Sequence, residues 1–314
     1  MTSALRSTTR RGLLLMTAGT LLASTLACAK RVETTDPAYA AELARWHEAR
    51  IAALTREDGW LTLVGLYWLH RGVNRFGSAP GNEVILHGAD VPPVAGLFEV
   101  RSDGAVIVRT GPESGVTLAG APVAERTLRA DATGSPDVLA LGSLRFYIIE
   151  RAGTLGVRVK DLDSPAKKDF RGIETFPVDP AFRLDATFEA YPTPRQIEVP
   201  SAHGPAQSML VPGVVRFTVA GRACSLEPFV SSPDDRQFFF VFRDATAGRE
   251  TYGAGRFLDA EGPAAGSKRL VVDFNRAYNP PCAFTPYATC PLPPAANILP
   301  VRIEAGEMMR GGGH

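Results

Sequence analysis

The chain has 314 residues, of which 45% are hydrophobic, enough for one large or two medium-sized domains with a buried core. Its 34 Lys and Arg nearly balance its 33 Asp and Glu, so the sequence shows neither a basic nucleic-acid footprint nor an acidic tail, and we expect no nucleic-acid partner. The 30 glycines and 25 prolines favour many turns and short strands.

Residues 1–27 have the pattern of an export signal. Arg6, Arg10 and Arg11 precede an apolar run over residues 13–27 that is short for a membrane span. The stretch TRRGLLL within this segment resembles a twin-arginine signal. We therefore expect the protein to be exported, by this route or another.

Two cleavage sites are compatible with the end of the signal, STLACAK. A lipobox cleavage would leave Cys28 as the first residue and attach lipid to it, giving a lipoprotein on the periplasmic side of a membrane. An A-x-A cleavage after Ala29 would release a soluble periplasmic or secreted protein. We favour the lipoprotein, anchored to the membrane through Cys28, because a lone cysteine at the end of an export signal has little other use.

One helix is predicted in the N-terminal segment, residues 28–59. Asp36 can cap it, Pro37 suits its first turn and Gly59 ends it. The residues at helical spacing on its apolar face are Leu43, His47, Ile51 and Leu54.

From Trp60 onward, short apolar segments closed by Gly, Pro or Asp predict a mainly β fold. Residues 60–162 loosely resemble a forkhead-associated (FHA) β-sandwich: FGSAPGNEVIL is similar to its early loop and strand, VTLAGAPV to its late hairpin and LALGSLRFYI to its final pair. The Ser-x-x-His that helps such domains hold phosphothreonine is missing, and PPVAGLFEV lies near that place. We therefore expect a sandwich that does not bind phosphopeptides.

A polar stretch at residues 163–172 leads to a second β-rich region, residues 173–310, for which we expect a sandwich or barrel. Within it, RQFFFVFRDATAGRETYGAGRFLDA is predicted to form a hairpin around residues 244–248. Side chains two residues apart on a strand point the same way, so Glu250, Tyr252 and Arg256 are expected to share a face that suits an anionic ligand.

The segment DFNRAYNPPCAFTPYATCPLPP, residues 273–294, places many polar groups after the last predicted strand. Its prolines fix φ, so the segment loses less entropy when it holds polar groups in place. Such stiffness suits a binding site and equally suits a structural clasp. The polar groups are Asp273, Asn275, Arg276, Tyr278, Asn279 and Cys282.

Cys282 and Cys290 are candidates for a disulfide in an oxidising compartment, or for two buried thiols, with Cys224 left over. A metal site of Cys282 with His203 or Asp273 is an alternative, but C-x7-C is not a recognised zinc spacing and we predict no metal. The sequence also lacks a G-x-S-x-G elbow, a P-loop and a G-x-G-x-x-G after a strand, which disfavours common serine hydrolases and nucleotide enzymes. It indicates no particular cofactor.

The stretches WLTLVGLYWL, RDATAGRETYGAGRFL and DFNRAYNPPCAFTPYATCPLPPAANILPVRIEAGE resemble hallmark segments of the DUF1684 family, over about residues 38–307. The family is uncharacterised, so the resemblance brings no activity. It implies that residues 273–294 are the family's signature segment.

From these patterns we expect the C-terminal β domain to bind a small, anionic ligand. The predicted ligand-binding residues are Tyr252, Arg256, Asn275, Arg276, Tyr278 and Asn279. Glu250 and Asp273 are the acid–base candidates if the site is catalytic. The alternatives are a structural or interaction module of the cell envelope without a ligand, and a metal-dependent hydrolase that uses Cys282, His203 and Asp273.

Overall fold

A computed structural model describes residues 35–309 of the chain. The predicted export signal and the lipid attachment at Cys28 lie outside these residues. The long helix α1 (Pro37–Thr55) begins as expected, because the carboxylate of Asp36 accepts a hydrogen bond from the backbone N–H of Ala38 at 2.9 Å. None of the helices within residues 35–309 is both long and apolar enough to cross a membrane.

The buried face of α1 differs in part from the predicted one. Leu43 and Leu54 are buried as expected, whereas Ile51 is 36% exposed. Polar and aromatic residues replace Ile51 on the packed face: Tyr39 and Arg50 contact groups far along the chain, as described below. A stripe of apolar residues alone therefore did not identify this face.

Two sheets that share one hydrophobic core form the first β region. The first sheet has the order β1 (Leu63–Trp68), β11 (Thr154–Asp161), β10 (Leu144–Arg151), β9 (Leu139–Leu141), β6 (Thr117–Leu118) and β7 (Ala121–Pro122). The second has the order β3 (Val84–Ile85), β2 (Gly72–Gly77), β4 (Gly96–Val100), β5 (Val106–Thr110) and β8 (Glu125–Leu128). Phe76, Phe98 and Phe146 contact one another at the centre of the core, each fully buried.

The second β region consists of a four-stranded and a two-stranded sheet. The larger sheet has the order β14 (Arg222–Leu226), β13 (Gln207–Val219), β12 (Arg183–Val199) and β17 (Arg269–Asp273), and β15 (Gln237–Phe242) pairs with β16 (Arg256–Glu261). Phe240 and Phe242 of β15 pack with the larger sheet in a common core. The mainly β fold with one N-terminal helix is therefore confirmed, as an open arrangement: neither of these described sheets closes into a barrel.

The remaining helices are short. They are α2 (Pro165–Lys168) and the 3-10 turns η1 (Trp60–Thr62), η2 (Asp131–Thr133), η3 (Pro180–Phe182), η4 (Phe274–Arg276), η5 (Pro281–Ala283) and η6 (Ala295–Asn297).

The connection between β15 and β16 is longer than predicted. It spans residues 243–255, so Glu250 and Tyr252 lie in a loop and do not share a strand face with Arg256, which begins β16. The chain leaves the strand early because the Asp244 carboxylate accepts hydrogen bonds from both the N–H and the hydroxyl of Thr246, forming a local turn. The expected convergence on one strand is wrong for this reason.

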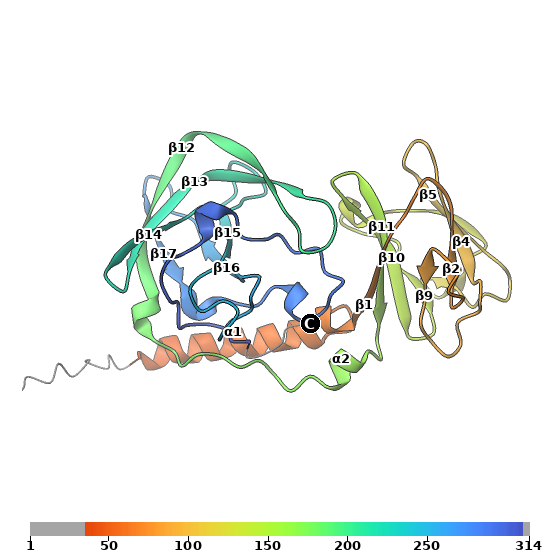
Figure 1. Ribbon diagram of the computed structural model, residues 1–314, viewed down its shortest axis with the longest axis horizontal. Helices are drawn as coiled ribbons and strands as arrows, with labels where there is room; N and C mark the ends of the chain where they lie inside the picture. Colours follow the sequence, from red (N-terminus) through yellow and green to blue (C-terminus); the bar gives the residue numbers. More distant parts are fainter. Residues whose placement is uncertain (1–34, 310–314) are drawn as a thin grey trace, which may run out of the picture. The chain divides into compact units, whose positions relative to one another are not determined.

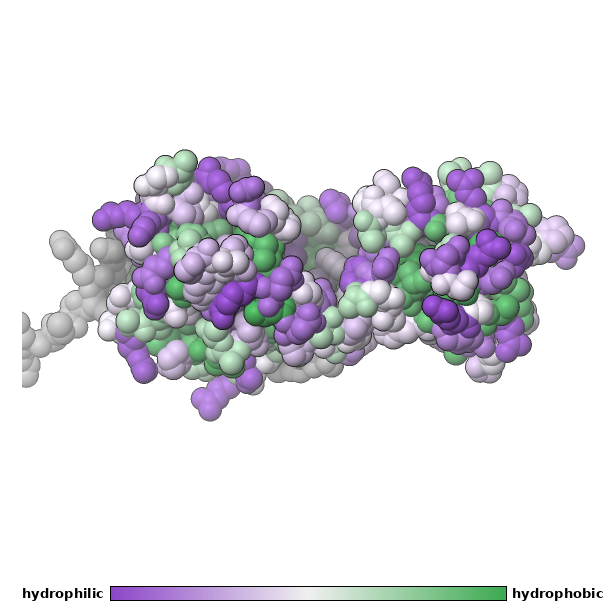
Figure 2. All heavy atoms as spheres, turned by 90° about the horizontal axis from the view of Figure 1, so that it is seen from above, coloured by the Kyte–Doolittle hydropathy of each residue, from purple (hydrophilic) through white to green (hydrophobic). Residues whose placement is uncertain are grey.

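Figure 1 shows α1 and the blue C-terminal segment on the same side of the second β region. Leu299, Val301, Ile303 and Ala305 of this segment are buried in the core. Hydrophilic residues cover much of the face in Figure 2, with hydrophobic residues between them. Asn279 of the signature segment is buried and bonds both to Arg50 of α1 and to Glu307 of the C-terminal segment.

Candidate functional site

Arg256 is fully buried and forms an ion pair with Asp244, whose side chain is also buried. The guanidinium donates to the carbonyls of Ile303 at 2.9 Å and of Ala305 and Glu307. Burial lowers the pKa of Arg256, and the neighbouring Asp244 carboxylate opposes this change. Arg256 was predicted to bind a ligand, but its end nitrogens bind the C-terminal segment.

A second polar network joins α1, the signature segment and the C-terminal residues. Arg50 of α1 donates to the Glu307 carboxylate at 3.0 Å and to the carbonyl of Asn279 at 2.8 Å. The other Glu307 oxygen accepts from the backbone N–H of Asn279 at 2.7 Å, and the Asn279 amide donates to the carbonyl of Met308. Burial raises the pKa of Glu307, and Arg50 partly offsets this rise.

Asp273 and Asn275 hold the first turn of α1. The Tyr39 hydroxyl donates to both Asp273 oxygens, at 2.8 and 2.7 Å. The Asn275 amide donates to the Tyr39 hydroxyl and to the carbonyl of Asp179, and its oxygen accepts from the N–H of Asp179. Desolvation raises the pKa of Tyr39 above its usual range, with the Asp273 carboxylate adding to the effect.

The other predicted site residues are spread over several contacts. Glu250 pairs with Arg302 at 2.9 Å, and this hydrogen bond lowers the pKa of Glu250. The Tyr252 hydroxyl donates to the carbonyl of Cys282. Tyr278 donates to Asp259 at 2.8 Å. Cys282 and Cys290 are adjacent free thiols, and their disulfide stays a prediction.

Asp273 and Arg276 are the two predicted site residues that line a described cavity. This cavity of about 450 Å³, which we call the arginine cleft, lies against α1, β12, β16 and β17. Its charged lining residues are Glu42, Arg183, Arg236, Asp259, Glu261, Asp273 and Arg276. A smaller hollow of about 190 Å³ shares Asp259, Glu261 and Arg276 with it and adds Trp46 and Gln237.

The arginines of the cleft differ in how far they are neutralised. Arg276 pairs with Glu42 of α1 and lies 3.6 Å from the Asp273 carboxylate, and its buried Nε has no hydrogen-bond partner within residues 35–309. Arg236 pairs with Glu261. Arg183 forms no ion pair among the described residues and lies over the Tyr39 ring, 5.4 Å from its centre. Arg183 is therefore the cation most available to an incoming anion.

Asp259 is an acidic residue of the cleft whose pKa is raised. Desolvation raises the pKa of its carboxyl group, although the side chain still contacts solvent, and the hydrogen bond from Tyr278 opposes the rise. A carboxyl group with a raised pKa beside arginines in a cavity is a candidate acid or base. No sequence pattern identified Asp259, because it resembles any outward-facing strand residue.

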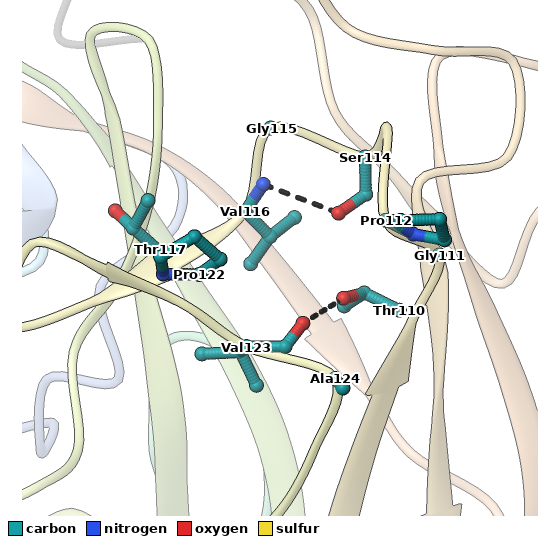
Figure 3. A pocket seen from close by; sticks show the side chains of 10 residues that line it. All are labelled: Thr110, Gly111, Pro112, Ser114, Gly115, Val116, Thr117, Pro122, Val123 and Ala124. Atoms are coloured by element: carbon teal, nitrogen blue, oxygen red, sulfur yellow. Dashed lines mark hydrogen bonds between the residues drawn. The ribbon is translucent and has the colours of Figure 1, made fainter.

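A separate cavity of about 370 Å³ lies in the first β region, where Figure 3 shows it between the end of β5, the following turn and β7. The Thr110 hydroxyl donates to the carbonyl of Val123, and Ser114 accepts from the N–H of Val116 at 3.3 Å. The residues that line this cavity carry no positive charge, so they offer no cationic side chain to a phosphate. That this region binds no phosphopeptide stays a prediction.

The metal-hydrolase alternative requires Cys282, His203 and Asp273 to meet. In the part of the chain that the structure describes, no three His, Cys, Asp or Glu side chains gather into a group that could hold a metal ion. The described residues therefore do not supply this ligand set.

The fold and cleft define an open β-sheet protein with a mixed-charge cavity beside its N-terminal helix. Residues 168–308 match the family model described as a protein of unknown function, DUF1684. The solution structure of an uncharacterised protein of Haloarcula marismortui is 31% identical, over 46% of this chain and 80% of that chain, with a TM-score of 0.40. The match over residues 168–308 confirms the resemblance to the DUF1684 family for that part of the chain.

Two FHA-domain structures are also similar to this chain. The FhaA FHA domain in complex with the intracellular domain of Rv3910 is 18% identical, over 30% of this chain and 97% of that chain, with a TM-score of 0.22. A structure described for phosphothreonine-dependent FHA domain interactions is 19% identical, over 32% of this chain and 96% of that chain, with a TM-score of 0.22. These likenesses concern the fold alone. A search of curated proteins finds no match.

Proposed function

We propose that the protein is exported and binds a small anionic ligand in the arginine cleft. One observation carries this proposal: Arg183, Arg236 and Arg276 come from three separate segments to the same cavity of about 450 Å³. Cavities of roughly 300–1,000 Å³ accommodate small molecules. A guanidinium group binds carboxylate or phosphate through two parallel hydrogen bonds.

The proposal differs from the site predicted from the sequence. Arg276 keeps the role of a ligand contact, and Arg183 and Arg236 replace Arg256 and Tyr252. Asp259 replaces Glu250 as the acid–base candidate, because Glu250 is paired with Arg302 and lines none of the described cavities. Asp273 lines the cleft, but its oxygens are occupied by Tyr39 and Asn275, which suits a positioning role.

Calorimetric titration with citrate, succinate and inorganic phosphate tests this function. Removing one charged hydrogen-bond donor costs about 1.5–3 kcal/mol, so we expect Arg183→Ala to weaken binding at least about tenfold. Arg249→Ala is the matched control, because Arg249 is an exposed arginine of the same region that lines none of the described cavities. Equal affinities of the two variants for a bound anion would place the ligand elsewhere.

A structural module of the cell envelope is the second candidate function. It is favoured by the pairing of Asp273, Asn275 and Asn279 with α1 or the C-terminal segment. These contacts fasten the helix that follows the predicted export signal to the β core. Two results together would support this alternative. The protein would bind none of these anions, and loss of its contacts with α1 would disturb the cell envelope.

A further inference from the structure

Two cysteines of the signature segment, Cys282 and Cys290, are buried in the same hydrophobic cluster. The backbone N–H of Cys282 donates to the sulfur of Cys290 at 3.2 Å, so the two cysteines are in contact. Each cysteine is 4% exposed. The neighbouring Cys290 lowers the pKa of the Cys282 thiol, which favours its thiolate form, and burial opposes this change. The pKa of the Cys290 thiol is raised by the same contact and by burial.

A buried cation, Arg158, contacts the residue that precedes Cys290. Arg158 of β11 is 5% exposed, and its Nε has no hydrogen-bond partner among residues 35–309. Its guanidinium lies 5.3 Å from the centre of the Trp60 ring, and one end nitrogen is 3.5 Å from the hydroxyl of Thr289, the residue before Cys290. It forms no ion pair with a described carboxylate. A buried charge without a counter-ion is costly, and a nearby thiolate reduces this cost.

We propose that Cys282 and Cys290 form a peroxide-reactive dithiol, with Arg158 as the positioning residue that stabilises its thiolate. The thiolate attacks one oxygen of hydrogen peroxide, the O–O bond breaks, and a sulfenic acid and hydroxide form. The neighbouring sulfur then attacks the sulfenic sulfur, the S–O bond breaks, and a disulfide and water form. Two electrons pass from the sulfurs to the peroxide, and the two thiol protons complete two waters.

Cys224 provides an internal comparison. It lies half-buried on β14, away from the pair, and burial raises the pKa of its thiol. A neutral thiol is a poor nucleophile, so we expect Cys224 to react more slowly than the pair. This proposal is independent of the arginine cleft, because neither cysteine lines it.

Peptide mass spectrometry tests the proposal on the Cys224→Ser protein. After brief exposure to hydrogen peroxide, unfolding and alkylation, trypsin releases one peptide, residues 277–302, that holds both cysteines. We expect this peptide to lose two hydrogens and to take up no alkylating reagent. A peptide that remains doubly alkylated, or that carries sulfinic acid without a disulfide, would overturn the dithiol.

The role of Arg158 is tested by the rate of the same reaction. One unit of thiol pKa is a tenfold change in the thiolate equilibrium, so we expect Arg158→Gln to react up to about tenfold more slowly. Arg158→Lys keeps a cation and should recover most of the rate, and circular dichroism checks that both variants fold. A folded Arg158→Gln protein that reacts at the wild-type rate would overturn the role of Arg158.

Discussion

At the residue scale, Arg256 and Asp244 form a buried ion pair, and each side chain also makes hydrogen bonds to the backbone of Ile303. Breaking a buried pair by removing one partner costs about 3–5 kcal/mol. We expect Asp244→Ala to lower the free energy of unfolding in urea by this amount. Arg302→Ala, which breaks the exposed pair with Glu250, should change it little. Similar losses in both variants would contradict the structural role of Arg256.

Glu307 should make stability depend on pH. Its pKa is raised by burial above the value of about 4.3 for an unfolded glutamate, so the folded protein binds the proton more readily. The resulting stabilisation is complete below the unfolded pKa and is lost as pH rises through the folded pKa. The free energy of unfolding of the wild type minus that of Glu307→Gln should therefore fall as pH rises above about 4. A difference that rises over this range would contradict the raised pKa.

At the scale of elements, α1 is held mainly by side-chain hydrogen bonds near its two ends. Tyr39 bonds to Asp273 near the start of the helix, and Arg50 bonds to Glu307 and Asn279 one turn before its end. The signature segment thus serves as a clasp for α1, one of the two roles that its stiffness allowed.

Tyr39→Phe tests the clasp. Loss of the hydroxyl leaves the buried Asp273 carboxylate with fewer donors, which costs about 1–3 kcal/mol. We expect faster hydrogen exchange at the amides of α1 and a lower free energy of unfolding. Arg45→Ala is the control, since Arg45 is exposed on the same helix. Unchanged exchange in Tyr39→Phe would show that apolar packing alone holds α1.

Structural features that depend on a local pattern could be predicted from the sequence. The cap of α1 at Asp36 and the proline in its first turn, Pro37, each depend on a few adjacent residues. Contacts between residues that are distant in the sequence could not be predicted. Asp244 shortens β15 and pairs with Arg256, and Arg50 pairs with Glu307, 257 positions away. Arg183 and Asp259 of the cleft could not be predicted, because no spacing marks strand residues that tertiary packing brings to one cavity.

At the scale of the whole molecule, lipid attachment would place the cleft at a membrane surface. We expect the full-length protein to fractionate with membranes and the Cys28→Ala protein to leave them, because a thioether-linked lipid needs the cysteine sulfur. Membrane fractionation followed by intact mass measures both properties. Cleavage after Ala29 in the wild type, with no lipid mass, would establish the soluble alternative.

Retention of a small molecule from an extract of the producing cells tests ligand binding in the arginine cleft. The purified protein is mixed with the extract, separated from free small molecules and denatured, and the released compounds are identified by mass. We expect an anionic compound that the wild type and Arg249→Ala retain and that Arg183→Ala does not. Retention of no compound, or retention of the same compound by Arg183→Ala, would contradict this expectation.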